Sequence, residues 1–297
     1  MSRQAQRAGF VAVVGRPNAG KSTLLNHLAG EKLAMVSKKA QATRKRMNII
    51  VMHDNAQIIF VDTPGLHEKE KLLNRFMLEE ALKAVGDADL ILFLAPASDS
   101  IEAYEEFLEK IARKGTPHLV VLTKTDRVSN EKLLKKIGEY QKYQDRFEAL
   151  IPYSVKREGD KKQLLDAVAS RLPEHPWLFD PELLTTETIR DIYRELIREA
   201  LFEKLSEEIP YESDVVIDRV EEGETIDRVY ATIITEKETQ KRMIIGNGGE
   251  SIRRVGSYAR KLMETFSGKK IYLDLHVVVR KGWSKNRKSL EAIGYLF

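Results

Sequence analysis

The sequence predicts an α/β domain with a mostly parallel sheet flanked by helices, followed by a smaller α+β domain. Stretches typical of buried strands alternate with amphipathic helical stretches up to Leu172, which is the pattern of a parallel sheet with helices on both faces. Prolines then fall at positions 173, 176 and 181, and a helix cannot continue through them. We therefore expect domains at 1–173 and 188–297, joined by a linker at 174–187.

Composition allows a packed protein and excludes several classes of structure. Of the 297 residues, 42% are apolar, which is enough for a hydrophobic core and argues against disorder. The lack of cysteine excludes disulfides and thiolate metal sites, and it fits a reducing compartment. The N-terminus lacks the apolar region of a secretory signal, and no apolar run approaches the roughly 18 residues that span a membrane. We expect a cytoplasmic protein.

Charge is distributed unevenly along the chain. The formal net charge is +4, but residues 238–297 hold 13 Lys and Arg against 5 Asp and Glu, so this part carries +8. The residues before it carry −4. A strongly basic end behind a weakly acidic first part favours a polyanionic partner for that end.

The first motif has the pattern of a phosphate-binding loop. An apolar strand at Phe10–Val14 leads into a stretch that fits G-x-x-x-x-G-K-[ST], and a helix at Ser22–Leu28 follows. Glycines allow close approach of the backbone, and N–H groups at a helix start attract anions, although an ordinary glycine-rich turn is the alternative. Lys21 would reach the outer phosphates and Ser22 would bind Mg²⁺. The predicted nucleotide-binding residues are Gly15, Arg16, Pro17, Asn18, Ala19, Gly20, Lys21, Ser22 and Thr23.

A second motif follows the third predicted strand. After a polar loop at 31–45 come strands at 47–53 and 57–61, and the latter ends at Asp62-Thr63-Pro64-Gly65. An acidic residue at the end of a buried strand, followed by a glycine turn, completes a phosphate site. Asp62 would hold Mg²⁺ and the Gly65 N–H would sense the γ-phosphate. The alternative is a plain turn, because Asp, Pro and Gly are also common turn residues.

The remaining elements of the first domain continue the alternation. The predicted order is helix 74–85, strand 89–95, helix 100–113, strand 118–122, helix 131–143, strand 149–153 and helix 161–172. In such sheets ligands bind at the carboxyl ends of the strands. All of the motifs fall at those ends.

Two further motifs predict which base the site accepts. The stretch T-K-T-D at 123–126 follows one strand, and the Asp126 carboxylate could accept from guanine N1–H and its exocyclic amine. Adenine has no donors there and would leave the carboxylate unpaired. Lys124 would lie along the ring, and Ser154 and Val155 would bring a backbone N–H to guanine O6. For Ser154, an ordinary serine after a strand is the alternative.

In this order, the motifs resemble those of the translation-factor-type P-loop GTPases. The resemblance implies a P-loop GTPase fold for the first domain, with GTP or GDP and Mg²⁺ as ligands. Thr123 stands where the base motif usually has Asn, and Leu66 stands where Ras-like proteins have a water-orienting Gln. We therefore expect a weaker brace between the base and phosphate loops, and slow intrinsic hydrolysis. Asn18 matches an Asn that helps to bind potassium in several relatives, which implies K⁺ beside the phosphates as a hypothesis.

The second domain places a glycine loop within a characteristic order of elements. We predict helix 188–205, strands 214–221 and 228–235, short helix 240–245, a G-x-x-G loop, helix 250–266 and strand 270–279. This order resembles the type II KH domain of RNA-binding proteins, whose loop clamps about four nucleotides. The alternative is a plain turn between helices. The implied RNA-binding residues are Lys241, Arg242, Ile244, Ile245, Gly246, Asn247, Gly248, Gly249, Arg253 and Arg254.

The basic tail at 280–288 leaves two interpretations open. Its charge favours contact with RNA, but a solvated surface would have the same composition. Trp283 within it would either stack on a base or pack into the domain.

Over almost its whole length the chain resembles the Era family of GTPases. The resemblance rests on G-R-P-N-x-G-K-S, K-A-Q-x-T-R at 39–44, D-T-P-G-L-H at 62–67, and the ending G-W with L-x-x-I-G-Y. It implies a GTP-driven factor in assembly of the 30S ribosomal subunit, which binds 16S rRNA near its 3′ end and contacts the inner membrane peripherally. It also implies catalytic roles for Lys21, Thr43 and Gly65, with Thr43 on Mg²⁺ beside Ser22 and Asp62. We expect a monomer.

Two other functions remain open at this point. A membrane-associated signalling GTPase would use the basic end on anionic lipid, and liposome flotation without RNA would detect it. A metabolic enzyme that spends GTP on a small substrate would need a second pocket. The sequence shows no acid/base or metal cluster for such a pocket, because its six histidines are scattered.

Overall fold

The computed structural model describes residues 5–36, 43–64, 72–110, 115–205 and 208–295. The chain forms two compact units, the first built mainly from residues before 187 and the second mainly from residues 187–297. Each unit is described by itself below. Gly65, Leu66 and the motif residues at 39–42 lie outside the described residues.

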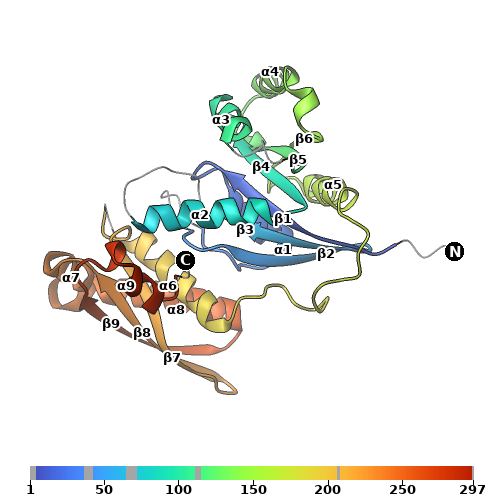
Figure 1. Cartoon of the computed structure of the whole chain (residues 1–297). Helices are drawn as coiled ribbons and strands as arrows, with labels where there is room; N and C mark the ends of the chain where they lie inside the picture. The colour runs from blue at the N-terminus through green and yellow to red at the C-terminus, as the bar shows by residue number, and fades with distance from the viewer. Residues whose placement is uncertain (1–4, 37–42, 65–71, 111–114, 206–207, 296–297) are drawn as a thin grey trace. The chain divides into compact units, whose positions relative to one another are not determined.

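The first unit is built on a six-stranded sheet within the described residues, with strand order β2-β3-β1-β4-β5-β6. All neighbouring pairs are parallel except β2 and β3, which form an antiparallel hairpin. Figure 1 shows the sheet and its helices. The strands are β1 (Arg7–Gly15), β2 (Met47–His53), β3 (Ala56–Asp62), β4 (Leu90–Pro96), β5 (His118–Thr123) and β6 (Ala149–Pro152).

Helices cover both faces of this sheet, as the alternation of elements predicts. α2 (Leu72–Gly86), α3 (Glu102–Lys110) and α4 (Asn130–Gln141) bury apolar side chains against β1, β4 and β5. α1 (Lys21–Ala29) and α5 (Glu158–Ala169) contact β2 and β3. β3, β4 and β5 are buried along their whole length, which explains the apolar runs at their centres.

Within the described residues, the predicted bounds of helices and strands agree with the structure to within three residues. The largest shifts are of three residues, at the start of β1 and at both ends of α5. Glu158 and Asp160 occupy its first turn, where a carboxylate is favoured by the helix dipole. The apolar pattern missed this turn because it holds no buried residue.

The segment after Pro173 lies along the sheet rather than apart from it. The Gln57 side chain accepts from the Leu178 and Phe179 backbone N–H groups at 2.8 and 2.9 Å, and its amide donates to the Phe179 carbonyl. Further along, the N–H of Ile50 donates to the carbonyl of Leu184 at 2.8 Å. The chain between 177 and 185 is therefore attached to the β2–β3 side of the first unit.

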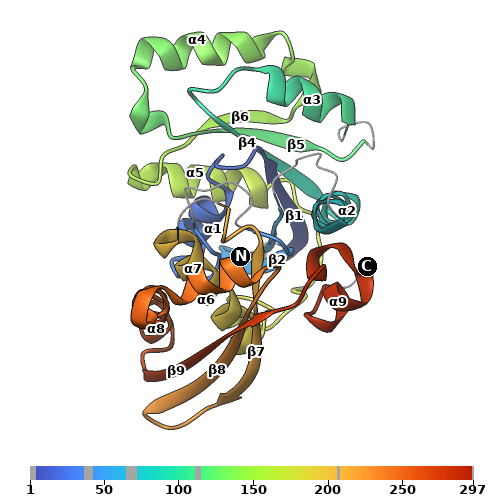
Figure 2. The same cartoon turned by 90° about the vertical axis from the view of Figure 1, so that its left-hand side faces the viewer.

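The second unit packs helices against one face of a sheet that has three strands among the described residues, in the order β7-β8-β9. β9 is parallel to β8, and β7 is antiparallel to it. α6 and α8 cover the face that carries Val229, Ala231 and Ile233, as Figure 2 shows for the elements. The elements are α6 (Ile189–Lys204), β7 (Ser213–Glu221), β8 (Ile226–Thr235), α7 (Glu238–Ile245), α8 (Glu250–Ser267), β9 (Lys270–Val279) and α9 (Arg287–Ala292).

A buried ionic network connects α6, β7 and the end of the chain. Arg194 donates to both carboxylate oxygens of Asp214 at 3.2 Å, and Arg198 lies 3.5 Å from the same carboxylate. The Tyr295 hydroxyl also donates to Asp214. A buried carboxylate requires such partners, because an unpaired charge in the interior is strongly destabilising.

The tail contains a short helix, α9, that the sequence analysis did not predict. Trp283 precedes it and is 1% exposed, so packing is the correct alternative for this residue. The Ser284 hydroxyl donates to the Glu236 carboxylate at 2.7 Å, which attaches the tail to the end of β8. Across the described ranges, we find no helix with the length and apolarity needed to cross a bilayer.

Candidate functional site

The loop between β1 and α1 holds its lysine inside the protein. Lys21 is 7% exposed, and its Nζ donates to the carbonyls of Gly15 and Arg16 at 3.1 and 3.3 Å. Burial lowers the pKa of Lys21, and the nearby Asp62 carboxylate opposes that shift. The ammonium is therefore fixed at the mouth of the loop by main-chain oxygens, at the start of a helix whose N–H groups favour an anion.

Glycine is required at the start of this loop because the backbone there lies close to the neighbouring strand β4. A Cβ at Gly15 would lie 2.6 Å from the Leu94 carbonyl oxygen, and the Gly15 φ of 156° disfavours other residues as well. Asn18 has a φ of 63°, a left-handed conformation that Asn tolerates better than most residues. The loop is thus tightly folded against β4.

Three oxygen ligands converge beside the lysine. The Ser22 hydroxyl donates to the Asp62 Oδ2 at 2.9 Å, and it lies 3.3 Å from the Thr43 hydroxyl. Thr43 lies 3.5 Å from the same carboxylate oxygen. Two hydroxyls and a carboxylate form the hard-oxygen set that Mg²⁺ prefers, so the chemistry of these residues fits that ion.

A brace connects the base motif to the phosphate loop. The Thr123 hydroxyl donates to the Ala19 carbonyl at 2.7 Å, and both residues are buried. Lys124 Nζ donates to the Asn18 carbonyl at 2.5 Å. Threonine therefore makes the hydrogen bond expected of the more usual Asn, and whether this brace is weaker remains a prediction.

The carboxylate expected to select guanine has a partner on each oxygen. Asp126 accepts from the Ser154 hydroxyl at 2.9 Å and from Lys156 Nζ at 2.8 Å. These hydrogen bonds, that of Lys156 first, lower the pKa of Asp126. The Ser154 N–H donates to Asp160 at 2.7 Å, which leaves the Val155 N–H as the candidate donor for guanine O6.

Sequence reasoning missed the part that Lys156 plays at Asp126. Its position two residues after Ser154, at the end of the same strand, was the available signal. It also missed Thr63 as a brace, since the Thr63 hydroxyl donates to the Val13 carbonyl at 2.7 Å and fixes the end of β3 to β1. Gly65 and Leu66 lie outside the described residues, so their roles stay predictions.

Two features lie away from these motifs. His53, Asp54 and Asp166 bring possible metal-ligating atoms within 4.8 Å of one another, but His53 pairs with Asp166 at 2.6 Å and Lys162 pairs with Asp166 at 2.7 Å. The contact between His53 and Asp166 therefore connects the β2–β3 hairpin to α5.

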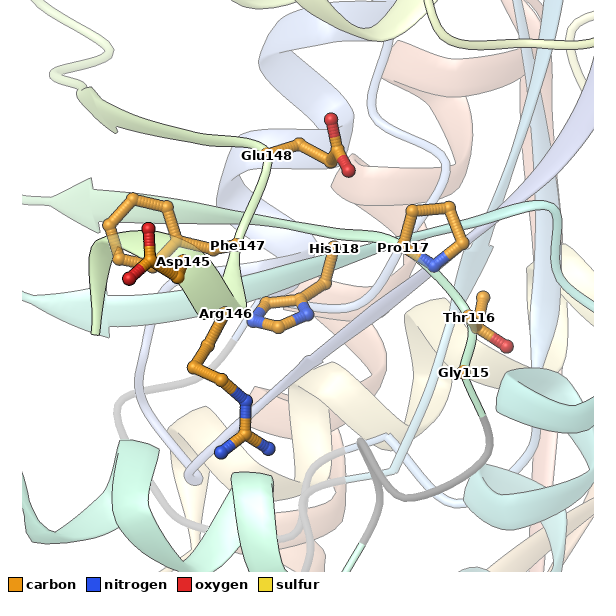
Figure 3. Close-up of a pocket in the computed structure, with 8 residues that line it drawn as sticks. All are labelled: Gly115, Thr116, Pro117, His118, Asp145, Arg146, Phe147 and Glu148. Carbon is orange, nitrogen blue, oxygen red and sulfur yellow. The ribbon is translucent and has the colours of Figure 1, made fainter.

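The other feature is a cavity of about 250 Å³ at the beginnings of β5 and β6, the opposite ends from the motifs. Figure 3 shows Arg146 and Glu148 at its walls, pointing in different directions. His118 in its lining is hydrogen-bonded to Tyr104 at 2.9 Å, and burial lowers its pKa to about 4. His118 therefore stays neutral near pH 7, as a packed residue.

The glycine loop of the second unit is open where the first loop is enclosed. It connects α7 to α8, and Gly248 and Gly249 have φ values of 56° and 79°. A Cβ at Gly248 would meet no atom of the described residues within 4 Å, whereas one at Gly246 would lie 2.6 Å from Ser251. The loop therefore needs Gly246 to fold, while Gly248 leaves an exposed surface.

The predicted RNA-binding side chains surround this loop. Arg242, Arg253 and Arg254 are exposed, and Lys241 is partly exposed. Ile244 is fully buried in the core of the unit, so its contribution is to support the loop, and Ile245 is half-buried beside it. The structure thus brings the predicted cations to one end of the unit without testing their role.

Comparison with protein families matches both units. A family described as 50S ribosome-binding GTPase matches residues 10–124, and the KH domain family matches residues 196–284. The chain is 51% identical to GTPase Era of Campylobacter concisus, over 97% of this chain and 100% of that protein. It is 50% identical to GTPase Era of Helicobacter pylori strain 26695, over 98% and 97% of the two chains.

Solved structures agree with these relatives. A variant of Aquifex aeolicus Era bound to GDP and AlF₄⁻ has a TM-score of 0.93 and 31% identity, over 98% of this chain and 100% of that one. Era in complex with MgGDPNP and nucleotides 1506–1542 of 16S ribosomal RNA has the same TM-score and 32% identity, over the same shares. Since the similarity spans both units at about 50% identity to curated relatives, the chain belongs to the Era family of GTPases.

Proposed function

We propose that this GTPase binds 16S rRNA near its 3′ end and acts in assembly of the 30S ribosomal subunit, with GTP and Mg²⁺ at the first unit. The observation that carries the proposal is the open glycine loop at 246–249, set between basic helices in a chain of the Era family. A relative in this family was solved with a segment of 16S ribosomal RNA. A membrane-associated signalling role is not favoured.

In the first unit, the residues bind and orient the nucleotide. Lys21 would reach the outer phosphates from a fixed position, and the hydroxyls of Ser22 and Thr43 with the carboxylate of Asp62 would hold the metal ion. Mg²⁺, when bound, neutralises charge that develops on the phosphates during in-line hydrolysis. Asp126 selects guanine, and the hydrogen bond from Thr123 to Ala19 fixes the position of the base loop relative to the phosphate loop.

In the second unit, glycine allows the RNA backbone to lie against the protein. A side chain at Gly248 would project into the space that a sugar-phosphate occupies, because nothing among the described residues fills that space. Arg253 and Arg254 on α8, with Lys241 and Arg242 on α7, supply positive charge to the phosphates. Loss of the γ-phosphate would release the loops around Thr43 and Asp62, which we propose alters access to the RNA.

The test is RNA binding by the purified protein with a non-hydrolysable GTP analogue. One RNA ends in the 16S 3′ sequence, and a scrambled RNA of equal length is the control. Gly248→Asp should weaken binding at least tenfold, since Asp tolerates the left-handed backbone but repels phosphate. Gly248→Asn is its neutral match, and should lose less affinity.

Three results would contradict the proposal. The first is equal, salt-sensitive binding to both RNAs, which would reduce the second unit to an electrostatic patch. The second is an unchanged affinity in Gly248→Asp. The third is flotation with anionic liposomes that does not depend on nucleotide and is stronger than RNA binding, which would support the membrane alternative.

Further proposals concern the whole chain and a potassium site. We propose domain limits at 1–173 and 188–297, a monomer, and a cytoplasmic location with peripheral contact at the inner membrane. We also propose that Asn18 supports a potassium ion beside the phosphates. Equal GTPase rates in sodium and potassium buffers would contradict that role for Asn18.

A further inference from the structure

The helix that follows the glycine loop has two faces of different chemistry. Val255, Ala259 and Met263 are fully buried in the core of the second unit, and Ile252 and Leu262 pack beside them. The opposite face carries exposed cations at the helical spacing of about 3.6 residues. They are Arg253, Arg254, Arg260 and Lys261.

We call these four residues the α8 cationic face. Among the described residues, no ion pair is formed by any of them. Neither carboxylate of the same helix, Glu250 or Glu264, forms an ion pair with them in the described residues, and Glu264 accepts a hydrogen bond from the Ile271 N–H. Unneutralised, exposed charges of one sign favour a polyanion.

Other arginines of the second unit show that this arrangement is not general there. Arg194 and Arg198 are both nearly buried, and each is paired with Asp214 or Glu195. Arg219 and Arg287 of the same unit are exposed, and they also pair with carboxylates, those of Glu221 and Glu291. The difference indicates that the α8 cationic face serves a ligand from outside the chain.

The α8 cationic face continues along the helix away from the glycine loop. Arg253 and Lys261 are eight residues apart, which is about 12 Å along a helix. A G-x-x-G loop clamps about four nucleotides, and Arg253 and Arg254 lie within the first turn or so beside it. Arg260 and Lys261 lie about two turns further along α8.

We propose that Arg260 and Lys261 bind phosphates of the RNA that lies beyond the nucleotides held at the glycine loop. This rests on the proposed function, because it extends the RNA path of the same unit. The ligand is RNA backbone read by charge, without base recognition. Long RNAs then gain affinity and salt dependence from α8, whereas an RNA that fills only the loop does not.

The experiment uses the full chain and two RNAs with the 16S 3′ sequence. One is a hexanucleotide that fills the loop, and the other corresponds to nucleotides 1506–1542. The test variant is Arg260→Gln with Lys261→Gln. The matched control is Arg228→Gln with Lys270→Gln, two exposed cations of the same unit. Their neighbours Val229 and Ile271 point into the core, so this control pair lies on the opposite face of the sheet.

We expect the test variant to bind the long RNA about tenfold more weakly near 0.1 M salt, with a salt slope lower by about 1.5, while hexanucleotide binding is unchanged. The control should bind both RNAs as the unmodified chain does. Equal losses on both RNAs, equal losses in test and control, or an unchanged long-RNA affinity would each overturn the inference. Failure of the unmodified chain to bind the hexanucleotide would instead overturn the proposed function.

Discussion

The two glycine-rich loops of this chain are built in opposite ways. The loop at 15–22 is enclosed: its lysine is buried, Gly15 approaches the backbone of β4, and Thr123 braces it from the side. The loop at 246–249 is exposed, with two successive glycines in left-handed conformations and space around Gly248. We propose that both use glycine to bring the main chain close to phosphate.

The difference follows from what each loop must hold. A nucleotide is small and can be surrounded, so fixed donors inside the protein contact it without reorganisation. A polymer must enter and leave sideways, so its clamp has to stay open along one direction. Charge is placed accordingly, with one buried ammonium at the first loop and several exposed cations at the second.

The largest expected effect comes from removing the lysine of the first loop, which should affect hydrolysis but not RNA binding. Lys21→Met removes the buried ammonium but keeps an apolar stem of similar length, so we expect GTP hydrolysis to fall by about 10²- to 10³-fold. Single-turnover phosphate release measures this loss. RNA binding without nucleotide is the control and should be unchanged. A variant that still hydrolyses GTP within threefold of the normal rate would exclude Lys21 from the site.

The next prediction concerns stability and compares alanine at one glycine of each loop. Gly15→Ala should lower the free energy of unfolding of the first unit by about 3 kcal/mol, because the new Cβ meets the Leu94 oxygen. Gly248→Ala should cost the second unit only about 1 kcal/mol, from its left-handed backbone.

The two tryptophans allow this comparison to be measured in urea. Trp177 lies on the first unit and Trp283 in the second, so Trp→Phe variants assign each unfolding transition by fluorescence. Equal losses of unfolding free energy in Gly15→Ala and Gly248→Ala would show that alanine is no more costly in the enclosed loop than in the open one.

A smaller effect is expected from the brace. Thr123→Val leaves the buried Ala19 carbonyl without this hydroxyl, and we expect GTP affinity to fall about five- to tenfold. Thr123→Ser retains the hydroxyl and should stay near the original affinity. Fluorescent GTP titration measures both variants. If valine and serine give equal affinities, the brace does not contribute.

The smallest effect is a pH dependence of guanine recognition. Hydrogen bonds, that of Lys156 first, lower the pKa of Asp126 below its ordinary value. The carboxylate therefore stays ionised until the pH falls to that lowered pKa. GDP affinity should therefore remain flat as pH falls toward 5. In Lys156→Met the decline should begin at higher pH. Identical pH profiles for the two proteins would show that Lys156 does not tune Asp126.

Much of this architecture could be predicted from the sequence, because it depends on local patterns. Apolar runs predicted β3, β4 and β5, and each motif was found at the end of a strand where the sheet topology puts it. The glycine loop of the second unit was predicted in the same way, from its place between two helical patterns.

Contacts between distant residues could not be predicted, because no periodicity records them. Thr123 and Ala19 are 104 residues apart, and Tyr295 and Asp214 are 81 apart. The pairing of Asp126 with Lys156 depends on how two strand ends meet in space. The α9 helix was also missed, since six residues carry too little apolar pattern to distinguish a helix from a basic tail.

The attachment of the connecting segment to the sheet has a consequence for self-association. β2 is the outermost strand on its side of the described sheet, and its sequence Ile49-Ile50-Val51 is apolar. An exposed edge of this kind is a template on which another chain can add a strand. Here Thr185 forms a bridge with Ile49, and the Ile50 N–H is already bonded to the chain's own backbone. The segment that joins the two units thus also protects the protein from edge-to-edge aggregation.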